Sequence, residues 1–66
     1  MRPWEKTLND LHRQGWSYGY AGFIDPETRK HFWLADASKG SISVHGIGET
    51  MNLAVDSLMD QMNKIL

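Results

Sequence analysis

The chain contains no cysteine, which excludes disulfide bonds, thiolate zinc sites and a nucleophilic thiol. It has no apolar run near the roughly 18 to 20 residues that cross a bilayer. The opening segment MRPWEKTLNDL also lacks the apolar region of a signal peptide. We therefore expect a cytoplasmic protein with no membrane partner. The chain also has no large excess of either charge, since it contains seven basic and eight acidic residues. Duplex-binding proteins usually carry a basic excess.

The chain does contain enough apolar material for one small core. Of its 66 residues 41% are hydrophobic, and three of them are tryptophan. This composition is typical of a folded globule rather than of a disordered chain. The length allows one domain at most, so residues 1–66 are interpreted as a single domain.

The apolar spacing predicts a helix at each end of the chain. The first helix spans residues 3–14, because Pro3 suits a first helical turn and Gly15 suits the position just after a last one. The second helix begins near Thr50, a suitable N-cap. Its apolar stripe consists of Met51, Val55, Leu58, Met62 and Ile65, widened by Ala54, Met59 and Leu66.

Three extended segments separate the helices, over residues 16–24, 30–37 and 41–45. Asp25-Pro26-Glu27-Thr28 predicts a turn, with Asp at the first position and Pro at the second. A three-residue loop at 38–40 follows the second strand, with Gly40 at its end. The expected fold class is α+β in the order α-β-β-β-α, with a three-stranded antiparallel sheet and both helices on one face.

These turn lengths predict which side chains share a face of the sheet. The face expected beneath the helices holds Gly19, Ala21, Phe23, Phe32, Leu34, Ile42 and Val44. The face expected to be open adds Ser43 to six proposed partner-binding residues, which are Trp16, Tyr18, Tyr20, His31, Trp33 and His45. Large exposed aromatic patches on small proteins usually mark contact surfaces. Alternatively, a bulge at a strand glycine turns some of these rings inward, and Trp16 packs under the first helix in any register.

Catalytic and cofactor chemistry has little support in the sequence. His31 and His45 would flank Trp33, but no carboxylate joins them because Asp36 falls on the other face, so we expect ordinary surface histidines and no metal site. The segment GIGETMNLAV has two glycines ahead of a helix but no phosphate-loop lysine, and Glu49 stands where an anion would bind. We expect no enzyme activity and no cofactor, and we interpret GIGET as a capped corner between strand and helix.

The element order together with this segment resembles the double-stranded RNA-binding domain. That family's second helix opens with Gly-x-Gly-x-Ser-Lys-Lys-x-Ala-Lys, and Gly46, Gly48, Thr50 and Ala54 match its glycines, hydroxyl and alanine. The segment Leu8-Asn9-Asp10-Leu11, after Pro3, is similar to the family's first helix. The resemblance implies the dsRBD-like fold over nearly the whole chain.

The residues with which this family usually contacts RNA are missing from the sequence. Its three phosphate-binding lysines correspond to Met51, Asn52 and Val55 here, and two acids, Asp56 and Asp60, follow along the helix. Loss of three lysine contacts lowers affinity by roughly a hundredfold to a thousandfold at moderate salt. The Gly-Pro-x-His segment of the family's first hairpin is also absent.

A second resemblance concerns the junction of the last strand and the last helix. Gly48-Glu49-Thr50-Met51-Asn52-Leu53-Ala54 is similar to the Gly-[Asp]-Thr-x-x-[Glu]-Ala segment of HicB-type antitoxins. That family neutralises a partner protein built on a double-stranded-RNA-binding scaffold. This resemblance covers the last two-thirds of the chain and implies a protein partner.

The leading functional hypothesis is a small non-catalytic binding module that contacts a protein partner or a second copy of itself through the aromatic face. A small bacterial or phage protein fits the size. The alternative is RNA or another nucleic acid, with single-stranded bases stacked on the aromatic face. In a duplex mode the contacts would come from Lys6, Arg13, Arg29 and Lys30, on the first helix and the first hairpin tip.

Overall fold

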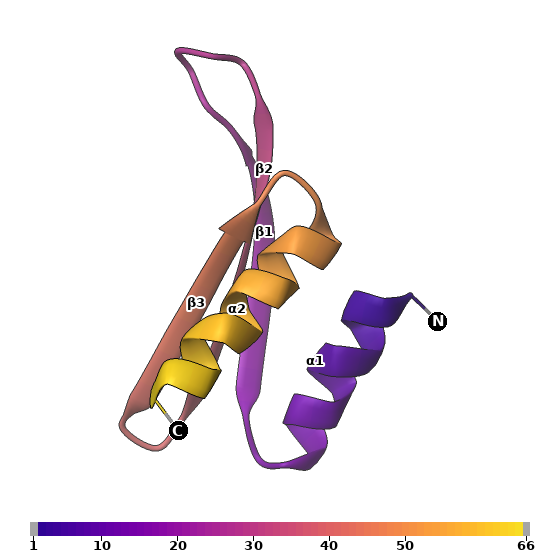
Figure 1. Cartoon of the computed structure of the whole chain (residues 1–66), viewed down its shortest axis with the longest axis vertical. Helices are drawn as coiled ribbons and strands as arrows, with labels where there is room; N and C mark the ends of the chain where they lie inside the picture. Colours follow the sequence, from indigo (N-terminus) through magenta and orange to yellow (C-terminus); the bar gives the residue numbers. More distant parts are fainter. Residues whose placement is uncertain (1, 66) are drawn as a thin grey trace.

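The computed structural model describes residues 2–65, so Leu66 of the expected apolar stripe lies outside the described residues. The elements are α1 (Pro3–Arg13), β1 (Ser17–Ile24), β2 (His31–Lys39), β3 (Ile42–Gly48) and α2 (Met51–Ile65). This order confirms the predicted α-β-β-β-α arrangement (Figure 1). The second and third strands run farther than expected, to Lys39 and Gly48.

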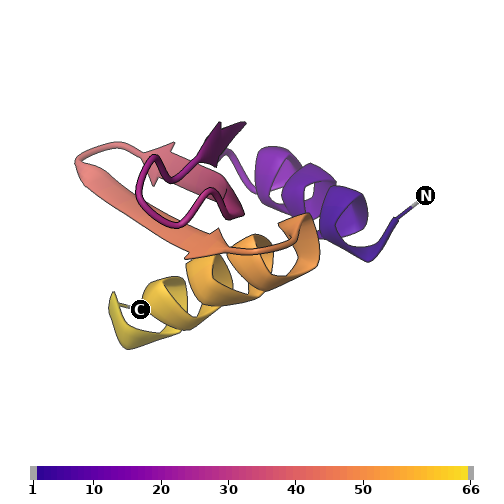
Figure 2. The ribbon, with the colours of Figure 1, turned by 90° about the horizontal axis from the view of Figure 1, so that it is seen from above.

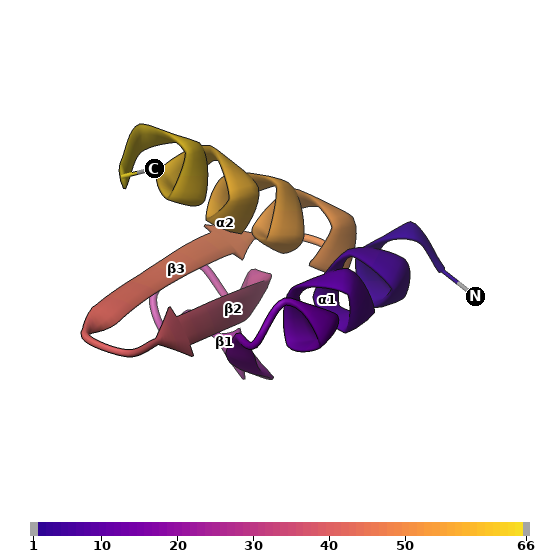
Figure 3. The same ribbon diagram turned by 90° about the horizontal axis from the view of Figure 1, so that it is seen from below.

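The three strands form an antiparallel sheet in the order β1-β2-β3. Both helices lie on the same side of this sheet, α2 along β3 and α1 beside β1 (Figures 2 and 3). We name this side the covered face and the opposite side the uncovered face. Neither helix within residues 2–65 has the length and apolar character needed to cross a membrane.

The end of α1 is closed by a Schellman motif centred on Gly15. This glycine has a φ of 95°, its N–H donates to the carbonyl of His12 at 3.0 Å, and the N–H of Trp16 donates to the carbonyl of Leu11 at 3.0 Å. The motif turns the chain back so that Trp16 enters the core, where its side chain is only 5% exposed. The predicted helix stop at Gly15 is confirmed.

The loop between β1 and β2 is organised by Asp25, as its turn chemistry predicts. The Asp25 carboxylate accepts the N–H of Glu27 at 2.9 Å, and the Asp25 carbonyl accepts the N–H of Arg29 at 2.7 Å. Arg29 has a φ of 60°, a left-handed conformation that costs a non-glycine residue free energy. Beyond the last pair of β2 with β3, residues 23–32 project from the body as a two-stranded arm (Figure 1).

The connection between β2 and β3 differs from the expected three-residue loop. Lys39 pairs with Ile42, so only Gly40 and Ser41 lie between the strands, and Gly40 takes a φ of 60°. Glycine at the first central position is what a type II′ two-residue hairpin turn requires. At this corner the Lys39 ammonium donates to the Gln14 carbonyl at 2.8 Å and thereby caps the end of α1.

The shorter turn corrects the predicted faces. The first hairpin register is confirmed, since Phe23 pairs with Phe32 and Ala21 with Leu34. The predicted placement of Ile42 and Val44 beside them is wrong, because a one-residue shift moves every side chain of a strand to the other face. The covered face is also the opposite of the one predicted, with a buried centre formed by Ala35, Ala37 and Val44.

Gly46 and Gly48 explain why the helices select this face. A Cβ on Gly46 would overlap the main chain of Ala54 and Leu58, and a Cβ on Gly48 would come within 2.7 Å of the Ala54 nitrogen. The glycines therefore allow α2 to lie directly on β3. The corner itself lies after them, because neither glycine has a positive φ and β3 runs through both. The predicted cap is present, since the Thr50 hydroxyl accepts the N–H of Leu53 at 3.2 Å.

Candidate binding surfaces

The six proposed partner-binding residues do not share one open face. Trp16 is buried in the core instead of standing on an open face. Tyr18, Tyr20, His31 and Trp33 do share a face, but it is the covered one, because Tyr18 pairs with Ala37 and Tyr20 with Ala35. The prediction of an open face carrying all six residues is therefore wrong.

His45 lies on the uncovered face, where it is the cross-strand neighbour of Asp36. His31 lies on the covered face and packs at 5.0 Å from the ring of Trp33, over the bare backbone of Gly22. The two histidines are therefore on opposite sides of the sheet and form no pair. No cluster of three or more metal-ligating side chains occurs in the described part of the chain.

The aromatic side chains on the covered face remain partly accessible because α2 lies over β3 and does not cover β1. Tyr20 is 52% exposed and Tyr18 is 38% exposed. The Trp4 ring of α1 meets the Tyr20 ring edge-on, with centroids 5.4 Å apart and planes at 71°. The expected aromatic surface thus exists as a strip beside α1 rather than as a flat open platform.

The uncovered face carries an apolar patch that consists of Ala21, Phe23, Phe32, Leu34 and Ile47. The first four of these residues were predicted to lie beneath the helices. The rings of Phe23 and Phe32 stack with centroids 5.7 Å apart, and Ile47 is 51% exposed. A signal for this placement was present in the sequence: Ala35, Ala37, Gly46 and Gly48 are small residues at alternate positions, suited to a helix-covered face.

The edge of the sheet at β1 is open. β1 pairs with β2 on one side only, and all of its residues except Gly19 are exposed. Its sequence SYGYAGFI contains no charged residue and no proline. Natural edge strands usually carry a charge, a proline or a bulge, because an unprotected edge pairs with other strands.

The four basic residues considered for nucleic-acid contact lie on two separate elements. On α1, Lys6 and Arg13 are exposed, and Arg13 pairs with Asp10 at 3.6 Å. At the loop of the arm, Arg29 and Lys30 are exposed, and Lys30 pairs with Glu49 at 3.9 Å. Acidic partners therefore offset half of this positive charge.

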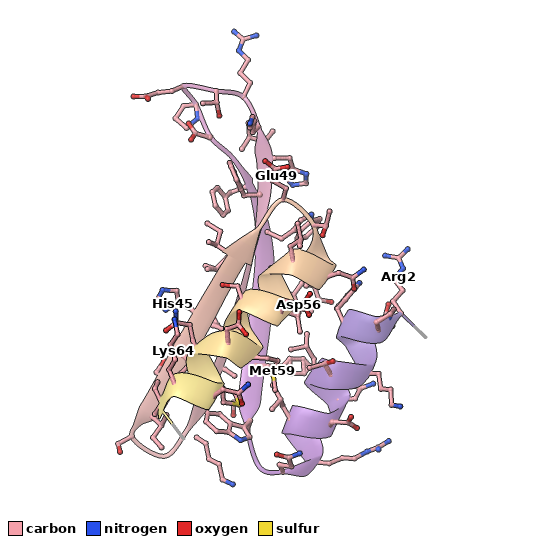
Figure 4. All side chains as sticks on the ribbon, viewed as in Figure 1. Arg2, His45, Glu49, Asp56, Met59 and Lys64 are labelled. Carbon is pink, nitrogen blue, oxygen red and sulfur yellow. The ribbon has the colours of Figure 1, made fainter. Side chains whose placement is uncertain are left out.

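Glu49 lies where β3 ends and α2 begins, facing the arm, whereas Arg2 lies at the start of α1 (Figure 4). A hollow between these two helix starts is lined by Arg2, Trp4, Trp33 and residues 49–52. The described residues of this lining include one guanidinium, of Arg2, and one carboxylate, of Glu49, so their charges balance. On the other side of the sheet, His45 points away from both helices (Figure 4).

Compared with known proteins, the chain matches no protein family and no curated protein.

Proposed function

We propose that the chain is a non-catalytic protein-binding module that accepts a strand of its partner along the free edge of β1, and that the partner is a second copy of the chain. The observation that carries the proposal is the unprotected state of β1, an outer strand with no charge and no proline. Strand addition supplies main-chain hydrogen bonds to an edge that has none on its outer side.

The side chains of β1 are suited to antiparallel pairing with themselves. If Ala21 lies opposite Ala21 of the second copy, Phe23 lies opposite Gly19 and Tyr20 lies opposite Gly22. A large ring over a strand glycine is a favourable cross-strand pair. This register keeps the helices of both copies on one side and joins the two apolar patches, since Ala21 and Phe23 belong to the patch.

The distribution of charge supports a protein partner over a nucleic acid. Arg13 and Lys30 already have acidic partners, and Glu49 stands between the hairpin arm and α2. Phosphate binding depends on unpaired basic residues, each of which releases counterions from the nucleic acid. The resemblance to the double-stranded RNA-binding domain therefore supports a shared scaffold, and the resemblance to HicB-type antitoxins supports a protein partner.

Sedimentation velocity and light scattering over a range of concentrations test the proposal. We expect the wild-type chain to dimerise, and Ala21→Glu to shift it to monomer, because two carboxylates would then face each other across the two-fold axis. Ala21 is exposed, so the substituted monomer retains its core.

The matched control is Ser43→Glu, which places the same charge on the same uncovered face but on β3. This variant should dimerise like the wild type. A wild-type chain that stays monomeric at NMR concentrations, or equal effects of the two substitutions, would overturn the proposal. A gel shift of the wild-type monomer with RNA at low salt would instead favour nucleic acid.

A further inference from the structure

A hollow between α1 and β1 lies on the covered face and contains no residue of the apolar patch, although two of its lining residues belong to β1. It is lined by Trp4, Glu5, Leu8, Asn9, Tyr18 and Tyr20. The two tyrosines stand two residues apart on β1 and project from the covered face, beside the indole of Trp4. We name this site the tyrosine hollow.

The rings provide two walls that meet at a steep angle. Trp4 and Tyr20 are in contact at 5.4 Å between centroids with planes 71° apart, and Tyr18 extends the wall along the strand. The ring of His12, which is not part of the lining, lies nearly perpendicular to the Tyr18 ring, with centroids 6.3 Å apart. At the base lies Leu8, which is only 1% exposed and is fixed in the core.

The chemistry of this lining selects a cation. Aromatic faces attract positive charge through their quadrupoles, and tryptophan and tyrosine do so best. Glu5 is half-buried in the lining and adds a full negative charge. Within residues 2–65 no lysine or arginine lines the hollow, so no basic side chain of this chain occupies the position.

Other ligand classes fit the hollow less well. Among residues 2–65, the lining offers a metal ion a single carboxylate and no imidazole, and metal ions prefer several such ligands. An anion would be repelled by Glu5. A purely apolar group would leave the Glu5 carboxylate desolvated beside it, which is unfavourable.

We propose that the tyrosine hollow binds an alkylammonium group, with Trp4, Tyr18 and Tyr20 as its aromatic walls and Glu5 as its counter-charge. Two sources carry this group: a methylated lysine side chain on a protein, and a small molecule with a choline-type head. The quaternary ammonium is the form that best exploits such walls, because its methyl groups lose little hydration and contact several rings at once.

The test is an NMR titration that follows the Trp4 indole and the Tyr18 and Tyr20 amides. The probes are choline, the amide of N-acetyl-trimethyllysine, and 3,3-dimethylbutan-1-ol, which has the shape of choline without its charge. Both cations should shift these signals and the neutral alcohol should bind at least about tenfold more weakly. Tighter binding of the lysine derivative assigns the site to a protein, and tighter binding of choline assigns it to a small molecule.

Two variants test the assigned roles. Tyr20→Leu should weaken cation binding by about tenfold or more, and Glu5→Gln by several-fold with a smaller preference over the alcohol. The control is His45→Leu, which removes an exposed ring from the uncovered face, on β3, and should leave cation binding unchanged. Equal binding of choline and the alcohol, no shift at Trp4, or an equal loss in His45→Leu would overturn the proposal.

This inference does not require strand pairing at β1, although Tyr20 takes part in both proposals. The titration can be run on the Ala21→Glu variant, in which the hollow is intact because Ala21 projects from the uncovered face. Cation binding by a monomer would support the proposed ligand of the tyrosine hollow even if self-pairing fails. Dimerisation without cation binding would support self-pairing and overturn the proposed ligand.

Discussion

Gly46 of β3 lies directly against the main chain of Leu58 in α2, and no side chain separates them. A Cβ at Gly46 would overlap the Leu58 nitrogen and the Ala54 carbonyl oxygen, which belong to the helix backbone and are held by its hydrogen bonds. Because α2 approaches this closely, Ala54 and Leu58 are completely buried. The position of α2 on the sheet therefore depends on the absence of one methyl group.

We expect Gly46→Ala to lower the free energy of unfolding by about 1 to 3 kcal/mol, because the helix must move away from β3 to admit the methyl group. Urea denaturation followed by tryptophan fluorescence measures the change. The control is Gly19→Ala on β1, where the added Cβ meets only the side chain of Asp36, at 3.2 Å. That side chain can move, so a comparable loss in the control would contradict this explanation.

Lys39 stabilises the junction between α1 and the β2–β3 hairpin through its hydrogen bond to the Gln14 carbonyl. We expect Lys39→Met to cost about 0.3 to 1 kcal/mol, because it removes a positive charge from the end of the helix dipole and leaves the hydrophobic stem. The loss should shrink at high salt. Lys6→Met serves as control, since Lys6 is exposed near the other end of the dipole. Thermal unfolding at two salt concentrations separates the outcomes, and equal effects in both variants would rule out the cap.

Arg29 occupies a backbone conformation that favours glycine, with a φ of 60°. We expect Arg29→Gly to raise the free energy of unfolding by about 0.5 to 1 kcal/mol, because relief of strain exceeds the extra entropy of glycine in the unfolded chain. Glu27→Gly in the same loop should instead destabilise the protein, since Glu27 has no positive φ. Chemical denaturation of both variants decides the matter, and a destabilised Arg29→Gly would show that the arginine side chain matters more than its backbone.

Thr50 caps the start of α2 through its hydroxyl group. Thr50→Val keeps the shape but removes the acceptor for the Leu53 N–H, and we expect a loss of about 1 kcal/mol. Thr50→Ser retains the oxygen and should stay within a few tenths of a kcal/mol of the wild type. Hydrogen exchange of the Leu53 amide should accelerate in the valine variant alone. Unchanged exchange would show that water replaces the cap without cost.

Local chemistry accounts for the parts of the fold that were predicted. Gly15 stops α1, Asp25 organises the first loop, and Thr50 starts α2, because each acts on hydrogen bonds within a few residues of itself. The register of β1 with β2 was predicted for the same reason, since the even-length loop of residues 25–30 sets it. The sequence predicted only part of the tyrosine hollow. Its two tyrosines were identified as binding residues, but Trp4 and Glu5 come close to them only because α1 packs beside β1.

The sequence by itself determined the order of the elements, their caps and the first hairpin, because these depend on contacts between neighbours along the chain. Only the tertiary structure decided which face of the sheet the helices cover. Each face offers apolar and small residues, and β2 ends two residues later than expected, which places β3 in the other register. The choice depends on the close approach of α2 to Gly46, a contact between separate elements that no local pattern specifies.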